Sequence, residues 1–553
     1  MKRRIINLSK TNFDVIIIGG GITGACLAWD AINRGLTVAL IEKKDFGSAT
    51  SSASSKLLHG GIRYLQQGRI DKVRESALER VHYQSIAPHL SHYVPFVVPT
   101  YRSLLKGKFL LRLGMILYQI ICLGQNLWVR DPDKKVPGWR MLNKEQLLKY
   151  IPRFSSKSLT GAVLFQESHM YSSERMTMAF ISSSVRKGAI VANYVCADEF
   201  ILTNNKVSGI KATDYLSGKS LTIKADCVIN AAGPWIPSLN KSISTRKIVT
   251  AFSKGAHVVT KPITNDVAIA LPTRKQSQSI INRGGRHIFI IPWRGQSLIG
   301  TTYDAYEGEL DEVRPTEDNI EELISDINSA FREVVLHRKD VKYSFAGIYP
   351  LIDNEINTKV YQGTGEYQIV DHKIADKIDG LVTVFGAKFT TARLLAEKAL
   401  NQIEYKFTKT LKSCKTRMQP LYCGEINNVE QYRRLKHAAY ADILPPKVID
   451  HLVTCYGTEI DSIVEYVLKD KHRGEVLSMN YPDIEAQIIY AAEHEMACHL
   501  DDVLFRRTGL GTLGHPGFDV IERCAKIMSE CLQWDFAQRE SEINRVLSYY
   551  QYH

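Results

Sequence analysis

A G-x-G-x-x-G motif between two short apolar segments constrains this chain more than any other feature. Residues 15–18 form a continuous apolar run, typical of a buried strand in a parallel sheet, and Gly19, Gly21 and Gly24 follow at once. Such glycines permit a tight turn, bring backbone N–H groups close to a pyrophosphate and let the next helix pack against the strand. Glu42 ends the second apolar strand, near the place where a ribose-binding carboxylate is needed. We therefore predict a Rossmann-type dinucleotide site; the alternative is a glycine-rich turn in another α/β unit, with Glu42 as a solvated strand end.

A long polar segment follows this unit. Residues 48–55 are rich in serine, and residues 56–65 read KLLHGGIRYL. Small hydroxyl residues and open backbone suit a chain that passes along a flavin, although the residues alone indicate only a polar loop. The matching segments are Glu42, 45–46, 49–52, 54–57, 59–61 and 63–64, with further matches at 225–260, 286–302 and 381–393. Together they resemble the signature of FAD-dependent, membrane-associated glycerol-3-phosphate dehydrogenases.

The resemblance implies FAD as the cofactor. Residues 225–235 match the N-A-A-G-P-W of the family, where small residues let a strand end lie against the cofactor; a plain strand-to-helix turn is the alternative. Residues 381–393 resemble the return of the chain to the flavin ring, where a cation or a helix end would stabilise the reduced cofactor. The implied cofactor-binding residues are Gly19, Gly21, Gly24, Glu42, Thr50, Ser51, Ser52, Ser55, Lys56, Leu57, His59, Gly60, Gly61, Val195, Ala232, Gly233, Gly386, Lys388 and Thr390.

The resemblance also implies oxidation of glycerol 3-phosphate to dihydroxyacetone phosphate, with hydride transfer to FAD N5 and onward electron transfer to a quinone or to oxygen. His257 is the first candidate for the base that removes the hydroxyl proton, and His59 is the second. On residues alone, a lone histidine of this kind is more often structural. The implied catalytic residues are His257, His59, Arg63, Lys388 and Arg286, and the implied substrate-binding residues are Arg63, Tyr64, His257, Arg286, Tyr349 and Lys388.

Departures from the family pattern fall on the substrate side. Tyr349 stands where the family has an arginine that binds the substrate phosphate, and tyrosine lacks its charge and its bidentate fork. The family's paired aspartates appear here as Ser172 and Ser173, and Tyr303 replaces a third aspartate, although Asp304 is adjacent. The chain then either binds the phosphate through other cations or acts on an unphosphorylated hydroxy or amine substrate. Those other cations are Arg63, Arg286 and Lys388.

Composition bounds the choice of partners. The net charge of +13 suggests an anionic partner, namely a substrate phosphate, an acidic lipid or nucleic acid. The basic residues are spread along the chain, so nucleic acid is not expected, although a basic flavoprotein that binds RNA or acts as a scaffold stays an alternative. The ten cysteines are scattered without metal-like spacing, which indicates a reducing compartment. We expect a cytoplasmic protein, with the inner face of the cytoplasmic membrane as a further option.

Residues 109–124 are apolar but too short to cross a membrane, and they carry Arg112. They read either as a helix in the plane of a membrane or as a buried helix of the substrate domain. Any membrane contact should therefore be peripheral. Whether the chain forms a homodimer is open at this stage.

The expected fold class is α/β (α+β overall): a Rossmann-type FAD-binding domain interleaved with a β-sheet substrate domain, plus an all-helical C-terminal domain. At 553 residues the chain is too long for one core. Within 1–405 we expect FAD parts at about 12–90, 160–250 and 365–405 and substrate parts at about 91–159 and 251–364. Apolar stripes at helical spacing predict the C-terminal domain over 410–553. His494 and His499 are not spaced as zinc ligands on one helix face, so a metal is not expected.

Overall fold

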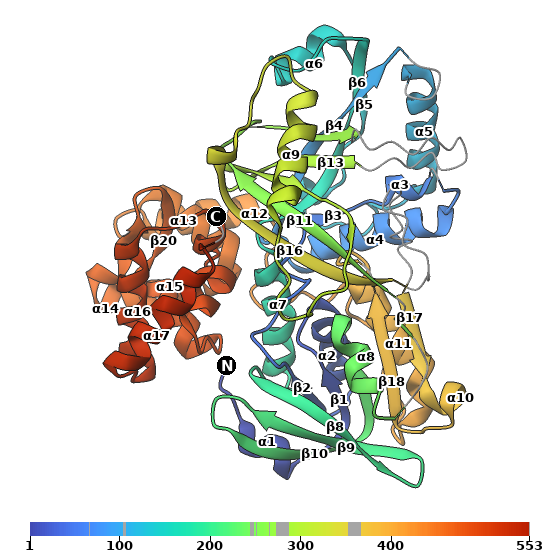
Figure 1. The fold of residues 1–553 in the computed structure, drawn as a ribbon, viewed down its shortest axis with the longest axis vertical. Helices are drawn as coiled ribbons and strands as arrows, with labels where there is room; N and C mark the ends of the chain where they lie inside the picture. Colours follow the sequence, from blue (N-terminus) through green and yellow to red (C-terminus); the bar gives the residue numbers. More distant parts are fainter. Residues whose placement is uncertain are drawn as a thin grey trace.

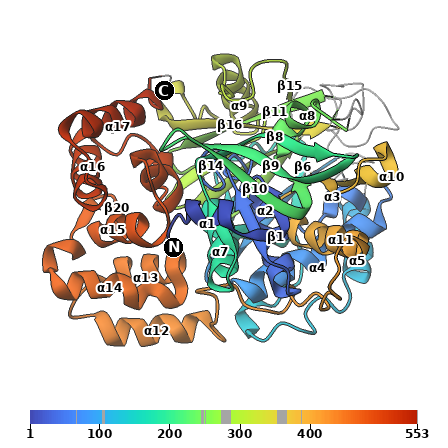
Figure 2. The same cartoon turned by 90° about the horizontal axis from the view of Figure 1, so that it is seen from below.

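The computed structural model describes residues 1–65, 67–102, 107–243, 248–249, 251–264, 266–272, 287–351, 367–386 and 388–551. Two large sheets form the body of the molecule, and a helical domain lies against their junction (Figure 1). Viewed from below, the N-terminus lies between the body and the helical domain (Figure 2). The α/β class with a helical C-terminal domain is confirmed.

The first sheet has the strand order β17-β18-β10-β1-β2-β7, with β8 and β9 attached beside β10. Strands β18, β10, β1, β2 and β7 run parallel, as the apolar runs predict. The strands are β1 (Asn12–Ile18), β2 (Val38–Ile41), β7 (Ile190–Ala192), β8 (Val195–Thr203), β9 (Lys206–Asp214), β10 (Lys219–Asn230), β17 (Tyr367–Asp371) and β18 (Leu381–Gly386).

Strand β1 is buried on both faces. Val15 and Ile17 pack into a core with helices α2, α7 and α11, whereas Ile16 and Ile18 pack under the β8–β10 strands. This double burial is the reason that the run is apolar throughout rather than alternating. The helices of this region are α1 (Ile5–Lys10), α2 (Ile22–Asn33), α7 (Ser173–Arg186), α8 (Ile236–Asn240), α10 (His372–Asp376) and α11 (Ala392–Ile403).

The second sheet has the order β15-β11-β14-β13-β12-β4-β6-β3, with β16 paired to β11 and β5 paired to β6. We call it the substrate sheet. Its strands are β3 (Leu57–Leu58), β4 (Ser91–Tyr101), β5 (Arg140–Asn143), β6 (Leu159–Met170), β11 (Ala251–Thr260), β12 (Ala268–Pro272), β13 (His287–Trp293), β14 (Gln296–Gly300), β15 (Asp304–Ala305) and β16 (Val341–Leu351). Strand β6 belongs here, so the chain returns to the first sheet with α7 and β7, later than the expected residue 160.

The two faces of the substrate sheet have different neighbours. Ile320, Leu323 and Ile327 of α9 pack with Val258 and Ile290 on one face (Figure 1). The opposite face shares its core with helices α3, α4 and α5 and with the C-terminal domain. The helices that accompany the substrate sheet, on either face, are α3 (Ile62–Leu65), α4 (Ile70–Ile86), α5 (Lys108–Ile121), α6 (Lys144–Tyr150) and α9 (Glu317–Ser329).

The C-terminal domain is helical apart from one short hairpin. Its helices are α12 (Val429–Tyr440), α13 (Pro446–Tyr456), α14 (Ile460–Lys469), α15 (Glu485–His494), α16 (Phe518–Leu532) and α17 (Phe536–Ser548). The hairpin is formed by β19 (Val476–Ser478) and β20 (Tyr481–Ile484), so an all-helical domain is an overstatement. A single π-helical segment, η7 (Asp502–Arg507), lies between α15 and α16 and carries two buried arginines.

Candidate active site

The glycine motif forms the turn between β1 and α2. Gly19 has φ +105°, and a Cβ there would lie 2.6 Å from the Ala231 carbonyl oxygen. A Cβ on Gly24 would lie 1.9 Å from the Gly19 carbonyl oxygen, so helix α2 starts in direct contact with the turn. Gly21 occupies the N-cap of α2 in an extended conformation. The turn therefore holds the backbone at the helix N-terminus, where the free N–H groups favour an anion.

Glu42 lies beside this turn, at the end of β2. Its carboxylate accepts hydrogen bonds from the backbone N–H groups of Gly20 at 2.7 Å and Lys44 at 2.9 Å. Burial raises the pKa of Glu42 above its ordinary value. Strand end, turn and helix start thus converge as the sequence predicts, and they offer a carboxylate beside an anion-binding helix end. These features fit the ribose and pyrophosphate of a dinucleotide.

The serine-rich loop crosses from this turn to the substrate sheet. The Ser51 hydroxyl accepts a hydrogen bond from the Ile22 N–H at 2.9 Å, at the start of α2. The Thr50 hydroxyl donates to the Ile348 carbonyl of β16. Ser52 donates to its own loop, at the Ala49 carbonyl. The loop therefore spans the two sheets and leaves its backbone between them.

Lys56 does not present its charge to a cofactor in this structure. Its side chain is buried, and the ammonium forms an ion pair of 2.8 Å with Glu174 at the start of α7. It also donates to the Ser52 carbonyl and the Ser173 hydroxyl. The neighbouring Leu57 pairs with His169 in the substrate sheet. Lys56 is thus a structural anchor of the serine-rich loop.

A row of side chains crosses the inner face of the substrate sheet. Phe289 of β13, Gly300 of β14, His257 of β11 and Phe345 of β16 lie directly opposite one another on consecutive strands. The His257 ring stacks on Phe345 with ring centres 5.1 Å apart. A Cβ on Gly300 would lie 2.1 Å from His257 Cδ2, so only glycine leaves room for this imidazole.

His257 is buried, and its Nε2 lies 2.9 Å from Ser55 Oγ. Burial, helped by the Lys56 cation, lowers the pKa of His257 to about 3. The imidazole is therefore neutral at pH 7, with Nε2 at the edge that faces Gly300. The pair joins Ser55, a predicted cofactor ligand in the loop, to His257, the first candidate base on the sheet.

His59 and the predicted cations form a second cluster next to this row. The His59 ring centre lies 5.5 Å from that of Phe289, and the Arg63 guanidinium lies 5.9 Å from the same ring centre. Lys388 Nζ lies 3.6 Å from the centre of the Tyr64 ring. Burial and the cations of Arg63, Lys388 and Arg80 lower the pKa of His59 to about 3. The cluster is a positively charged region beside a neutral histidine.

The last flavin-side residues of the prediction lie partly beside His59 and partly at the strand ends of the first sheet. The Thr390 hydroxyl accepts a hydrogen bond from the His59 N–H at 3.1 Å, which ties the segment after β18 to the segment after β3. The Val195 N–H donates to the Glu42 carbonyl at 2.8 Å, at the edge of β2. Ala232 and Gly233 follow the end of β10, and Gly386 ends β18. These strand ends lie at one edge of the first sheet, beside the glycine turn.

Gly60 and Gly61 are explained by packing. A Cβ on Gly60 would lie 2.2 Å from the Tyr118 hydroxyl oxygen, and the Gly60 N–H donates to Glu167 at 2.7 Å. Glu167 in turn forms a buried ion pair of 3.0 Å with Arg80. Sequence reasoning missed this pair and the aromatic flanks of the row, because no local spacing connects residues so far apart in the chain.

The residues at which the chain departs from the family pattern, and the other predicted substrate ligands, lie in different surroundings. Tyr349 lies on the same sheet face as His257, and its ring centre lies 6.2 Å from that of Tyr303. Asp304 accepts a hydrogen bond from Asn319, at the start of α9. Ser172 caps helix α7 through the Arg175 N–H. Arg286, a predicted substrate ligand, lies outside the described residues.

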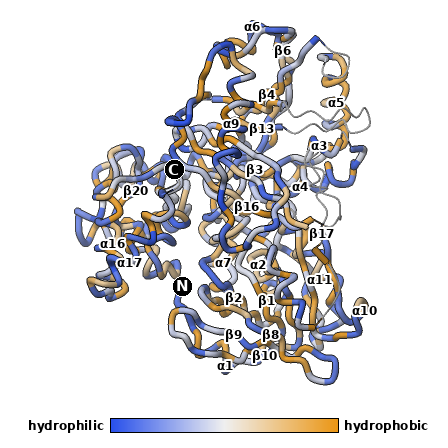
Figure 3. Tube along the Cα trace, in the orientation of Figure 1, coloured by the Kyte–Doolittle hydropathy of each residue, from blue (hydrophilic) through white to orange (hydrophobic). Residues whose placement is uncertain are grey.

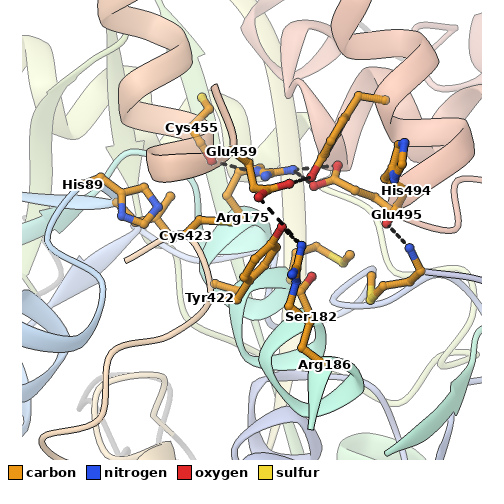
Figure 4. Close-up of a pocket in the computed structure, with 15 residues that line it drawn as sticks. His89, Arg175, Ser182, Arg186, Tyr422, Cys423, Cys455, Glu459, His494 and Glu495 are labelled. Carbon is orange, nitrogen blue, oxygen red and sulfur yellow. Dashed lines mark hydrogen bonds and ion pairs between the residues drawn. The ribbon is translucent and has the colours of Figure 1, made fainter. Parts of the chain in front are cut away.

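A separate pocket of about 550 Å³ lies away from this site, at the seam between α7 and the C-terminal domain (Figure 4). Its lining includes His89, Arg175, Arg186, Glu459 and Glu495. Arg175 pairs with Glu495 at 2.6 Å and Arg186 with Glu459 at 3.7 Å, so its strongest charges compensate one another. We therefore assign this pocket to the packing between α7 and the C-terminal domain rather than to the active site.

A Rossmann-type sheet joined to a β-sheet domain that presents histidines and cations defines a flavin-dependent oxidoreductase. Residues 14–399 match the family described as FAD dependent oxidoreductase. Residues 414–539 match the family described as the C-terminal domain of alpha-glycerophosphate oxidase. The glycine turn, Glu42 and the serine-rich loop fit the phosphates and ribose of FAD, whereas the Lys56 ammonium is engaged by Glu174.

Relatives that match over most of their length identify the family within the flavin-dependent oxidoreductases. A glycerol-3-phosphate dehydrogenase of Synechocystis sp. is 31% identical over 561 residues, which cover 99% of this chain and 98% of that protein. A probable mitochondrial glycerol-3-phosphate dehydrogenase of Dictyostelium discoideum is 30% identical, with 97% and 84% covered. The crystal structure of the glycerol-3-phosphate dehydrogenase from Bacillus halodurans complexed with FAD has a TM-score of 0.76 at 25% identity, with 99% and 96% covered. The chain belongs to the family of FAD-dependent glycerol-3-phosphate dehydrogenases, and its cofactor is FAD.

Proposed function

We propose that the protein oxidises glycerol 3-phosphate to dihydroxyacetone phosphate. The observation that carries this proposal is the cluster of Arg63 and Lys388 beside the neutral His59 and within reach of the His257 row. A substrate with an anionic group and a secondary alcohol matches cations and neutral imidazoles placed side by side. The full-length relatives support the same reaction, because they are a glycerol-3-phosphate dehydrogenase and a probable one.

The reaction needs a proton acceptor for the hydroxyl group and an acceptor for the hydride on the same carbon. Bound FAD supplies the hydride acceptor. His257 Nε2 takes the hydroxyl proton, because it is unprotonated at pH 7 and faces the serine-rich loop, with Ser55 Oγ at 2.9 Å. An anionic substrate nearby raises the low pKa of this imidazole and so strengthens it as a base. His59 is the second candidate for this role.

Arg63 and Lys388 orient the substrate through its phosphate. Charge-assisted hydrogen bonds from a guanidinium and an ammonium fix an oxyanion more firmly than neutral donors do. Tyr64 lies under the Lys388 ammonium and holds it by a cation–π contact of 3.6 Å. Arg286 is a further phosphate ligand in this proposal. Electrons then pass from the reduced cofactor to a quinone or to oxygen.

A second candidate is the oxidation of an unphosphorylated hydroxy compound or amine. Tyr349 favours it, because this tyrosine lies on the substrate face where the family carries a phosphate-binding arginine. The cluster of Arg63 and Lys388 weighs against it, because cations in a substrate site favour an anionic substrate.

Anaerobic mixing of the purified protein with glycerol 3-phosphate, and separately with glycerol, tests the proposal. Loss of the visible absorbance of oxidised flavin with the phosphorylated compound alone is the expected result. Bleaching by glycerol or by an amine alone would replace the proposal with the second candidate. No bleaching by glycerol 3-phosphate, in a protein that dithionite still reduces, would refute the assigned substrate.

We also propose that α5 docks the protein on the surface of an anionic membrane. Its buried residues are Met115, Tyr118 and Ile121, whereas Phe109, with 82% of its surface exposed, opens an apolar face toward solvent. The other large apolar residues exposed on this helix and just after it are Leu110, Leu113, Ile116, Leu117, Ile120, Leu123, Leu127 and Trp128. The apolar character of the segment is visible in Figure 3.

The positive charges around α5 indicate that the partner of this apolar face is anionic. Lys108 and Arg112 lie on the helix itself, and Arg130 follows it. An apolar face bordered by cations matches a layer of anionic lipids, with the helix in the plane of the interface. Among the described residues, no helix is long and apolar enough to cross a membrane. A quinone dissolved in that membrane would then be close to the reduced cofactor.

A further inference from the structure

We infer that the C-terminal domain fixes both ends of the flavin loop, the segment 46–55, and thereby sets how tightly FAD is held. Asp45 precedes this loop and Lys56 follows it. Each of these residues is buried with a charged partner, and both partners are tied to the C-terminal domain.

Asp45 is held by two arginines from the π-helical segment η7. Arg507 donates to both carboxylate oxygens, at 2.7 and 2.8 Å, and Arg506 Nε donates at 2.7 Å. Asn193 adds a hydrogen bond of 3.0 Å. The Asp45 side chain is 0% exposed, and the cations of Arg507 and Arg506 hold its pKa well below the ordinary range. A charge buried in this way depends on its partners.

The position of Asp45 is passed on to the glycine turn through its next two neighbours. Phe46 is fully buried, and its ring would be 2.7 Å from a Cβ on Gly20. The Gly47 N–H donates to the Gly20 carbonyl at 3.0 Å. Gly20 is also the residue whose N–H binds Glu42. A shift of Asp45 therefore moves the backbone that faces the cofactor phosphates.

The other end of the flavin loop is fixed through α7. Lys56 pairs with Glu174, and the adjacent Arg175 pairs with Glu495 at 2.6 Å (Figure 4). Arg175 also donates to the Cys455 carbonyl at 3.1 Å, in α13.

Glu495 links the two ends of the loop. Its carboxylate binds Arg175, and its backbone carbonyl accepts a hydrogen bond of 2.9 Å from Arg507 Nη2. One segment of the C-terminal domain thus contacts both anchors. Between its ends the flavin loop is held by neutral hydrogen bonds of Thr50, Ser51 and Ser55, so among the described residues the two buried ion pairs at its ends are its only charged attachments.

Arg507 and Asp45 are positioning residues for FAD in this inference. Substitution of either residue should weaken FAD binding while the protein stays folded. Arg507→Met removes the bidentate contact, Arg507→Lys keeps the charge without the fork, and Asp45→Asn keeps the shape of the acceptor. Arg523→Met is the matched control, because Arg523 pairs with Glu475 and Glu485 inside the C-terminal domain, away from the loop.

The experiment follows release of FAD from the holoenzyme by flavin fluorescence after dilution, with circular dichroism to monitor the fold. We expect Arg507→Met and Asp45→Asn to raise the FAD dissociation constant at least about tenfold. Arg507→Lys should fall between them and the wild type, and Arg523→Met should release FAD at the wild-type rate. Excess FAD should restore the visible flavin spectrum of the Arg507→Met variant.

Two results would overturn the inference. One is wild-type FAD affinity in both Asp45→Asn and Arg507→Met. The other is equal loosening of FAD by Arg523→Met, which would mean that any weakening of the C-terminal domain has this effect. No substrate enters the measurement, so failure of the proposed substrate would leave the result unchanged.

Discussion

Phe289 and His257 lie on either side of Gly300 on the inner face of the substrate sheet. Gly300 is on the strand between theirs and puts no side chain between the two rings. The space over this glycine is taken by the His257 imidazole, whose Cδ2 and Nε2 would lie 2.1 and 2.7 Å from a Cβ at Gly300. His59 and Arg63 lie near the Phe289 ring on the neighbouring strand. A neutral histidine and a cation therefore lie close to the same part of the sheet face.

Gly300→Ala tests this space directly. The new methyl group would lie 2.1 Å from His257 Cδ2, so the imidazole has to move. We expect kcat to fall at least about tenfold, which corresponds to about 1.4 kcal/mol, while bound FAD is retained. Gly138→Ala is the control, because nothing lies within 4 Å of a Cβ at that glycine. Steady-state kinetics with the flavin content measured in parallel would contradict the assignment if kcat stayed at the wild-type value.

Arg63→Ala should weaken binding of the phosphorylated substrate more than it slows catalysis. A hydrogen bond to a charged group contributes about 1.5–3 kcal/mol, so we expect KM to rise about 10- to 100-fold. Lys388→Met should behave in the same direction. Arg153→Ala, whose side chain is 69% exposed on the surface, serves as control. Unchanged KM in both site variants would remove these cations from the substrate site.

Stability should fall as the pH drops below about 6.5. Burial lowers the pKa of His89 and His257 to about 3 and that of His169 well below its ordinary value, so all three stay neutral in the folded state. The unfolded chain binds their protons below pH 6.5, and each histidine then contributes a loss of at most about 1.4 kcal/mol per pH unit. Their stabilising effect is complete above pH 6.5 and is lost between there and pH 3.

Thermal unfolding of the holoenzyme between pH 7.5 and 5 measures this loss. Substitution of His169 by phenylalanine should flatten the slope, because one of the buried histidines no longer takes up a proton. His451 works in the opposite direction, since Asp483 raises its pKa against the effect of burial. A Tm that does not change over this range would contradict the prediction.

Removal of apolar side chains from α5 should detach the protein from lipid. Phe109→Ser together with Leu113→Ser removes two exposed residues from the docking face, and each buried side chain of this size contributes about 1.5–3 kcal/mol. We expect co-sedimentation with phosphatidylglycerol-containing vesicles to fall at least about tenfold. Phe536→Ser with Leu468→Ser is the control, because both residues are exposed in the C-terminal domain. Equal sedimentation of all variants would refute docking through α5.

The sequence predicts the local parts of the site because their determinants are local. The turn at Gly19 needs a positive φ and a close approach to Ala231, so glycine spacing alone reveals it. Glu42 follows from its place at the end of the next strand. The resemblance adds His257, His59 and the cations, which physical spacing alone would have assigned to ordinary structure.

The rest depends on contacts across the chain that leave no local pattern. Lys56 has the position of a cofactor ligand, but its charge is taken by Glu174, more than a hundred residues away. Phe289 and Phe345 flank the site only because their strands lie in register with β14 and β11. The pairing of Asp45 with Arg507 joins residues that no periodicity connects.

That last pairing has a consequence for the order of events during synthesis. The carboxylate of Asp45 emerges early, with the first strand pair, whereas both of its arginine partners lie near the end of the chain. Until those arginines arrive, the dinucleotide half would have to bury an uncompensated charge, which is strongly unfavourable. One parallel partner of β1 also comes late, since β10 follows it by some two hundred residues, and β18 pairs with β10 later still. The buried charge of Asp45 is therefore compensated only after the long stretch of chain between β2 and the π-helical segment η7 has been made.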